Sequence, residues 1–296
     1  MFLVSVAGCK RTEVVTSENN LAWFEPEKKQ RSLLMIFSAT WCPHCGYWGL
    51  PTFKATEKLL GDDALALDVH GVNSELAAYQ YKVGNDTPFY SKHVVGFGLN
   101  LENVEVSGLP SLCVNNKGGY TAGSEYTMAD DARAFNAQSP TANINFGVIK
   151  NQNGFIVRST TKFFKETSGE YYVSMFVTEN NVANRQNIAG TYDASYIHDN
   201  VIRWWPISNG VITDGIDKGL SKTFGNPVVS GQIPAGKCIN SEIAFTTLNK
   251  STLLPSGANF RAWDQNSTKD LYLTAIIWKK SSSGKYIFVN GVRKPF

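Results

Sequence analysis

The chain has 296 residues, of which 43% are hydrophobic and 18% are charged, and its formal net charge is +3. This length exceeds the roughly 100 to 150 residues of a typical domain, so we expect two domains, and the apolar content argues against general disorder. The small net charge, without a basic helix that interleaves aromatic residues, gives no reason to expect a nucleic-acid partner. No run approaches the roughly 18 apolar residues that a membrane-spanning helix needs.

The first residues suggest an export and lipidation signal. The segment from Met1 to Cys9 is uncharged and mostly apolar, and the chain turns polar at Lys10. A complete export signal has a charged start and about 7 to 15 apolar residues. Val6-Ala7-Gly8-Cys9 nevertheless resembles a bacterial lipobox, in which the cysteine is lipidated. We interpret residues 1–29 as a signal remnant and tether with Cys9 as the lipid-attachment residue; the alternative is a short apolar strand with a chance cysteine.

A strand–helix–strand unit is predicted around a C-x-x-C motif. Leu33–Phe37 is a continuous apolar run with the length of a buried strand. A helix should begin at Cys42, because Pro43 suits a first helical turn, where its missing N–H would be unsatisfied anyway. That helix should end at residues 61–63, and residues 64–69 form the next buried strand. This order predicts a βαβ unit with parallel strands.

The residues Trp41-Cys-Pro-His-Cys45 carry the predicted chemistry. Unsatisfied N–H groups at a helix N-terminus stabilise a thiolate, so Cys42 is the expected nucleophile of disulfide exchange. Cys45 lies one turn further on and is placed to resolve a mixed disulfide. His44 would favour the Cys42 thiolate and make the pair a better oxidant, and Trp41 would cover one side. The alternative is a static, inert disulfide.

A metal centre or cofactor is not expected. A zinc site would need a second C-x-x-C or a pair of histidines at close spacing. The four histidines lie far apart in the sequence, at His44, His70, His93 and His198. We therefore interpret His70 and His198 as structural residues, the latter together with Arg203.

The rest of the N-terminal half is expected to complete an α/β domain over residues 30–139. A helix is expected over 74–81 and a loop over 85–103. Strands at 111–114 and from Tyr120 should form an antiparallel hairpin, followed by a closing helix over 127–138. Cys113 should be a small buried hydrophobe, although a disulfide to Cys238 would tie the two halves together.

The pattern of apolar and turn residues changes after Pro140, and residues 140–296 are predicted to form an all-β domain. Short alternating runs are separated by turn residues, which is typical of a β-sandwich. Residues 180–222 are polar and aromatic and are interpreted as a long connection. Within it, Trp204-Trp205 is expected to pack between the domains, with an exposed binding patch as the alternative. The expected strands lie at 146–149, 155–157, 171–177, 242–248, 271–278 and 286–289.

Residues 30–139 resemble a thioredoxin-fold domain, and Cys42-Pro-His-Cys45 matches the motif of periplasmic disulfide oxidases. Pro110 matches the thioredoxin cis-proline, whose backbone faces the active-site sulfur and pairs with substrate. The whole chain also resembles a family of bacterial lipoproteins related to outer membrane protein twenty-eight. The resemblance rests on residues 39–45, 68–70 and 198–203, and it implies a thioredoxin-like domain followed by an immunoglobulin-like sandwich.

Three positions depart from the thioredoxin pattern. Ile36 stands where thioredoxins place a buried aspartate that relays protons, so an ordinary reductase is not expected. Pro51 lies nine positions after Cys42, whereas the helix proline of thioredoxins lies eight positions after the first cysteine. Leu109 precedes Pro110 where thioredoxins often have valine or threonine.

Two functions remain open from the sequence. The first is an exported thiol–disulfide oxidoreductase that acts on protein thiols and disulfides. The second is a surface lipoprotein with a binding or adhesion function, in which the C-terminal domain recognises a ligand. Both place the chain in the cell envelope as an outer-membrane lipoprotein, facing the periplasm or the exterior, with a lipid anchor as its contact with the membrane.

Overall fold

The computed structural model describes residues 15–17, 22–70, 97–151, 154–204, 224–246 and 268–296. Cys9, the helix expected over 74–81 and the side chains of Trp204 and Trp205 lie outside the described residues, so the predictions that concern them stay predictions. In the described part of the chain, every helix is too short or too polar to cross a membrane.

The described elements are short helices and a larger number of strands. The N-terminal half contains β1 (Val15–Ser17), β2 (Ser32–Ser38), a π-helical turn η1 (Cys45–Gly49), α1 (Leu50–Leu60), η2 (Gly61–Asp63), β3 (Ala64–His70), η5 (Gly98–Asn100), β4 (Ser111–Val114) and α3 (Glu125–Asn136). The remainder contains β5 (Ala142–Asn151), β6 (Gly154–Phe163), β7 (Thr167–Glu179), β8 (Val182–Ala183), β9 (Gln186–Ile188), β10 (Thr191–Asp193), β11 (Ile197–His198), β12 (Val201–Trp204), β13 (Asn226–Ile233), β14 (Cys238–Thr246), β15 (Leu271–Lys280) and β16 (Tyr286–Pro295).

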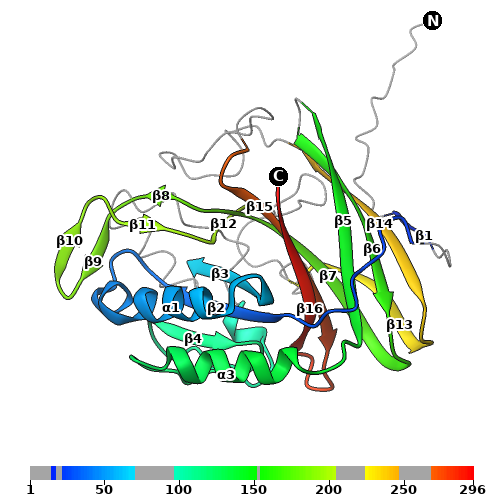
Figure 1. Ribbon diagram of the computed structural model, residues 1–296, viewed down its shortest axis with the longest axis horizontal. Coiled ribbons are helices and arrows are strands. Elements are labelled where there is room, and N and C mark those ends of the chain that lie inside the picture. The colour runs from blue at the N-terminus through cyan, green and yellow to red at the C-terminus, as the bar shows by residue number, and fades with distance from the viewer. Residues whose placement is uncertain (1–14, 18–21, 71–96, 152–153, 205–223, 247–267) are drawn as a thin grey trace, which may run out of the picture.

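The predicted βαβ unit and closing helix are confirmed. β2 and β3 pair in parallel, β4 pairs antiparallel with β2, and α1 and α3 lie side by side on one face of these strands (Figure 1). Leu34 and Ile36 point towards the helices, whereas Leu33 and Phe37 point to the opposite face. Because both faces of β2 are covered, the strand appears in the sequence as a continuous apolar run.

The hairpin predicted at Tyr120 is wrong. β4 pairs with β2, and beyond a single bridge between Val114 and Lys117 the chain runs on to α3 without a second strand. Tyr120 is buried among the residues beneath the helices, and its hydroxyl donates to Asp131 Oδ2 over 2.7 Å. The turn signal is therefore real, but the aromatic residue after it packs against the helix layer.

One sheet continues from β2, β3 and β4, the thioredoxin-like strands, into the second half of the chain. β12 pairs in parallel with β3, at Val201 and Asp68, and antiparallel with β7. The eight-stranded sheet has the order β16-β15-β7-β12-β3-β2-β4, with β13 also paired to β7 (Figure 1). Residues on both sides of position 139 therefore share a single hydrogen-bonded sheet.

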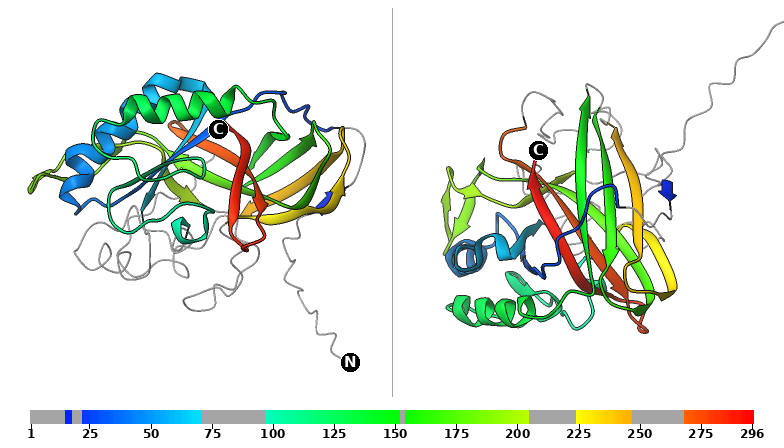
Figure 2. Two further views of the ribbon diagram at one scale, coloured as in Figure 1. Left: turned by 90° about the horizontal axis from the view of Figure 1, so that it is seen from below. Right: turned by 45° about the vertical axis from the view of Figure 1, so that its right-hand side comes forward.

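A second sheet covers the far end of the first. It has the order β1-β14-β6-β5 and lies beside β7 and β15 (Figure 2). Its apolar side chains pack on one face of these two strands. Two stacked sheets are thus present, but an immunoglobulin-like sandwich over 140–296 is not confirmed, because one of its layers is the extended central sheet. The reason lies in β7, where Val173 and Val177 face the second sheet while Tyr172 and Phe176 face the opposite core. A strand that is apolar on both sides must be covered on both sides.

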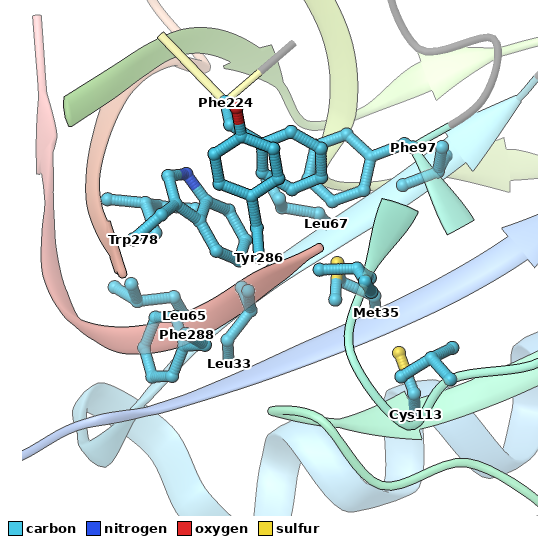
Figure 3. Packing of buried hydrophobic residues seen from close by; sticks show 14 of the residues in the cluster. Leu33, Met35, Leu65, Leu67, Phe97, Cys113, Phe224, Trp278, Tyr286 and Phe288 are labelled. Atoms are coloured by element: carbon cyan, nitrogen blue, oxygen red, sulfur yellow. The ribbon is translucent and has the colours of Figure 1, made fainter. Parts of the chain in front are cut away.

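The core on that opposite face joins the two halves of the chain. Leu33 and Leu65 of the thioredoxin-like strands pack in the same cluster as Trp278 of β15 (Figure 3). The Trp278 ring lies 5.1 Å from the Phe224 ring between centroids, and its Nε1 donates to Ser174 Oγ over 2.7 Å. Aromatic side chains dominate the energetics of such clusters.

Candidate functional site

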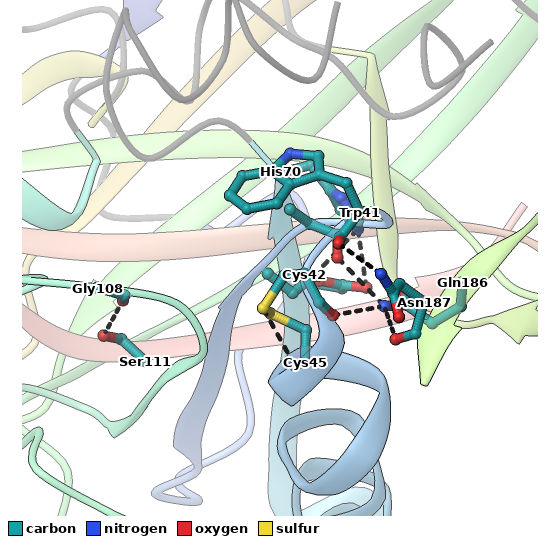
Figure 4. The surroundings of a disulfide bond; sticks show 11 residues. Trp41, Cys42, Cys45, His70, Gly108, Ser111, Gln186 and Asn187 are labelled. Carbon is teal, nitrogen blue, oxygen red and sulfur yellow. Dashed lines mark hydrogen bonds and ion pairs between the residues drawn. A yellow bond between two sulfur atoms is a disulfide. The ribbon is translucent and has the colours of Figure 1, made fainter. Parts of the chain in front are cut away.

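Cys42 and Cys45 form a disulfide between the end of β2 and the first helical turns, with their Cα atoms 5.3 Å apart (Figure 4). The Cys42 N–H donates to the Ala39 carbonyl over 3.2 Å, which closes the turn after the strand. The Cys45 N–H points at Cys42 Sγ over 3.1 Å. A backbone donor aimed at this sulfur at a helix N-terminus is the arrangement that stabilises a thiolate.

The helix after the motif opens with a π-helical turn over Cys45–Gly49, and Pro51 follows at the start of α1. Proline has no N–H to donate to the carbonyl four residues earlier, and a π turn holds one more residue than an α turn. Pro51 thus lies directly after this π turn, in the first turn of α1, where its missing N–H costs no hydrogen bond within that helix.

The predicted supporting residues divide into two groups. Trp41 and Leu109 pack against the buried cluster of Ala39, Cys42 and Cys45. The Leu109–Pro110 bond is cis, as the thioredoxin resemblance implies, and a Cβ atom on Gly49 would come within 2.6 Å of the Pro110 ring. Pro43 is half-buried, whereas the His44 side chain is exposed to solvent.

A segment that sequence analysis did not connect with the motif holds the C-x-x-C loop from the other side. The Gln186 side chain is fully buried, and its Nε2 donates to the carbonyls of Ala39 and Cys42, each over 3.2 Å. Asn187 donates from its backbone N–H to the Thr40 carbonyl over 2.7 Å and from Nδ2 to the Trp41 carbonyl over 3.2 Å (Figure 4). These carbonyls belong to the loop between β2 and the helix, and β9 supplies donors to them from two side chains and one backbone N–H.

The first helical turn after the C-x-x-C motif packs directly against β9. A Cβ atom on Gly46 would collide with the Asn187 carbonyl oxygen and would lie 3.0 Å from the Ile188 side chain. Glycine at position 46 therefore allows β9 to approach the first helical turn directly.

A second group of polar side chains is buried at the end of β3. Ser38 Oγ donates to Asp68 Oδ1 over 2.5 Å, and His70 Nε2 lies 3.1 Å from Asp68 Oδ2. The His198 ring, from β11, stands 6.1 Å from the His70 ring between centroids. Figure 4 includes His70 among the surroundings of the disulfide. Sequence spacing missed this group, because β11 joins it only through the fold.

The charges in this group follow from burial and neighbours. Burial by itself would raise the pKa of the Asp68 carboxyl, but the adjacent His70 and the hydrogen bonds from His70 and Ser38 outweigh it and hold the pKa below its usual range. Burial, with His70 beside it, lowers the pKa of His198 to about 4. Asp68 also pairs directly with Ile36 in the parallel register, so a buried acid lies one strand away from the position where thioredoxins have one.

Cys113 and Cys238 are both free and buried. The prediction that Cys113 is a small buried hydrophobe is confirmed, since it packs in the core with Met35 and Leu33, and the alternative disulfide to Cys238 is not formed. Burial raises the pKa of the Cys113 thiol to about 12.

We expect alkylation of the folded, reduced protein to distinguish the Cys42 thiol from the Cys113 thiol. With a pKa near 12, only about one Cys113 thiol in ten thousand is ionised at about pH 8. Iodoacetamide should therefore label Cys42, whose thiolate the Cys45 N–H favours, in the native state and Cys113 only in denaturant, as read from peptide masses. Rapid native labelling of Cys113 would contradict its burial.

One of the compared solved structures supports the fold. HBP35 of Porphyromonas gingivalis superimposes with a TM-score of 0.61 at 14% sequence identity, over 92% of this chain and 77% of that one. Protein AGR_C_4864 of Agrobacterium tumefaciens gives a TM-score of 0.46 at 11% identity, over 90% of this chain and 95% of that one. No protein-family model and no curated protein matches the chain. The fold is thioredoxin-like and carries a close C-x-x-C cysteine pair.

Proposed function

We propose that this chain is an exported thiol–disulfide oxidoreductase that acts on protein dithiols and disulfides through Cys42 and Cys45. The observation that carries the proposal is the disulfide at the helix N-terminus, with the Cys45 N–H directed at Cys42 Sγ and the cis Leu109–Pro110 segment beside it. Trp41 precedes the pair, Pro43 lies between the two cysteines, and the exposed His44 beside it is positioned to meet a substrate.

The reaction is a two-step exchange. A substrate thiolate attacks Cys42 Sγ and forms a mixed disulfide, and Cys45 leaves as a thiolate that takes up a proton. A second substrate thiolate then attacks the substrate sulfur of the mixed disulfide, and Cys42 leaves as a thiolate. The substrate loses two electrons as it gains its disulfide, and the Cys42–Cys45 pair gains them as it becomes a dithiol. The Cys45 N–H favours the leaving Cys42 thiolate, which supports an oxidising direction.

The cellular setting is part of the proposal. Disulfides persist in oxidising compartments such as the bacterial periplasm. We infer a lipid anchor at Cys9, a place in the outer membrane facing the periplasm or the exterior, and a relationship to the lipoproteins of the outer membrane protein twenty-eight family. Protein thiols and disulfides are the proposed partners.

The test is oxidation of a reduced two-cysteine peptide by the oxidised protein, followed by acid quenching and mass measurement. One equivalent of peptide disulfide should form per protein, and Cys42→Ser should reduce the rate to background. Cys45→Ser should accumulate a Cys42–peptide mixed disulfide under a mild oxidant, because its resolving thiol is missing. Cys113→Ser is the matched control and should behave as the unaltered protein does.

The thiolate gives an independent measure. The pKa of Cys42, followed by the ultraviolet absorbance of the thiolate in the reduced protein, should lie below the ordinary thiol value of about 8.5. No Cys42-dependent exchange, together with an ordinary or raised Cys42 pKa, would refute the enzyme proposal and favour a binding lipoprotein with a static disulfide.

A further inference from the structure

Three side chains with metal-ligating atoms meet at the end of β3. Asp68, His70 and His198 each offer one ligand atom, and these atoms all lie within 4.8 Å of one another. All three residues are almost completely buried, with at most 2% of their surface exposed. Two ligands come from β3 and the third from β11, so the group joins the central sheet to the segment that contains Gln186.

The donor set fits a divalent transition-metal ion. Two imidazoles and one carboxylate are ligands that Zn²⁺ and its neighbours in the first row accept. Ligands about 2.0–2.2 Å from a tetrahedral ion stand roughly 3.4 Å from each other. The 3.1 Å between His70 Nε2 and Asp68 Oδ2 is close to that separation. The ligand atom of His198 lies within 4.8 Å of both and would move inward to complete a set of three.

The surroundings provide the outer hydrogen bonds that orient metal ligands. Ser38 Oγ donates to Asp68 Oδ1, the carboxylate oxygen that does not face His70. The backbone of Arg185 lies beside the His198 ring. A second contact such as the one from Ser38 to the carboxylate fixes the orientation of a ligating side chain.

We propose that Asp68, His70 and His198 bind one divalent first-row transition-metal ion, of which Zn²⁺ is the representative. The ion would join β3 to β11, which pairs with β8, and so fix the base of the β8–β11 segment whose Gln186 and Asn187 hold the C-x-x-C loop. This proposal does not depend on turnover by the cysteine pair.

The experiment uses the full oxidised chain, in which Cys42 and Cys45 are bonded to each other and offer no thiolate. Protein stripped with a chelator is titrated with Zn²⁺ by calorimetry, and the bound metal is counted by mass spectrometry. One equivalent should bind, and His198→Ala should weaken binding by at least about 10-fold. His44→Ala, which removes an exposed histidine, is the matched control and should leave the affinity unchanged.

Cobalt identifies the ligands and covers the case in which His198→Ala misfolds. Bound Co²⁺ should show visible d–d bands without sulfur charge-transfer absorption, and His198→Cys should retain binding and gain that absorption. Failure of the unaltered protein to bind Zn²⁺ and Co²⁺, or a sulfur-type spectrum before any substitution, would overturn the proposal. So would equal affinities in the unaltered protein and in a folded His198→Ala variant.

Discussion

Replacing Trp278 with alanine should lower the free energy of unfolding of the whole chain by about 4 kcal/mol, within one transition. Trp278 is completely buried, and its ring contacts the rings of Phe97, Phe224 and Phe288. The substitution opens a cavity and leaves the Ser174 hydroxyl without its indole donor. Since native stabilities are about 5–15 kcal/mol, this loss is a large fraction of the total.

The single transition is the sharper part of this expectation. The cluster around Trp278 includes Leu33 and Leu65, and the sheet runs unbroken from β4 to β16, so the thioredoxin-like strands should unfold together with the C-terminal ones. Urea unfolding followed by circular dichroism and by tryptophan fluorescence should give coincident curves. Trp23→Ala, at a side chain that is 43% exposed, should change the stability by less than about 1 kcal/mol. Two separate transitions, of which only one shifts in Trp278→Ala, would indicate independent domains.

Local patterns predicted α1, α3 and most of the longer strands, because their signals lie within a few residues, whereas β8 to β12 fall in the expected connection over 180–222 and β13 was not predicted. Three features each specify one element by its own chemistry. They are the apolar run before Cys42, the proline in the first helical turn, and the turn residues between β15 and β16. The pairing of β12 with β3 has no such signal. Nothing in the residues around Val201 distinguishes a strand of a separate sandwich from a strand beside Asp68, because that choice depends on contacts between distant segments.

Some residues of the candidate site were predicted from the sequence, and others are brought to it only by the fold. The C-x-x-C spacing relates Cys42 to Cys45, and the resemblance to thioredoxins implied the role of Pro110; the structure has the disulfide and a cis Leu109–Pro110 bond. Gln186 was missed, because it stands 147 residues from Ala39 and its amide replaces a backbone donor, a role that leaves no motif. His198 was interpreted as structural because the histidines lie far apart in the sequence, whereas the fold brings its ring to 6.1 Å from the His70 ring between centroids.

Gln186→Ala should therefore loosen the redox loop. The carbonyls of Ala39 and Cys42 would keep their backbone donors but would each lose the hydrogen bond from Gln186. Two hydrogen bonds of about 1 kcal/mol each give a cost of about 2 kcal/mol for local opening. If reduction by dithiothreitol requires this opening, a change of that size makes reduction of the Cys42–Cys45 disulfide roughly 30-fold faster. The rate is measured by quenching with acid and counting labelled thiols.

The matched control is Gln232→Ala, on an exposed position of β13, which should leave the reduction rate unchanged. Urea unfolding of both variants separates local opening from global destabilisation. The increase in the reduction rate is converted to a free energy and compared with the loss in the global free energy of unfolding. A larger value from the reduction rate places the effect in the loop. An unchanged reduction rate in Gln186→Ala would mean that the Asn187 contacts and the packing of β9 on Gly46 hold the loop without the buried amide. The reactivity of the cysteine pair would then be set by the strand and helix that flank it, and the Gln186 amide would have no part in it.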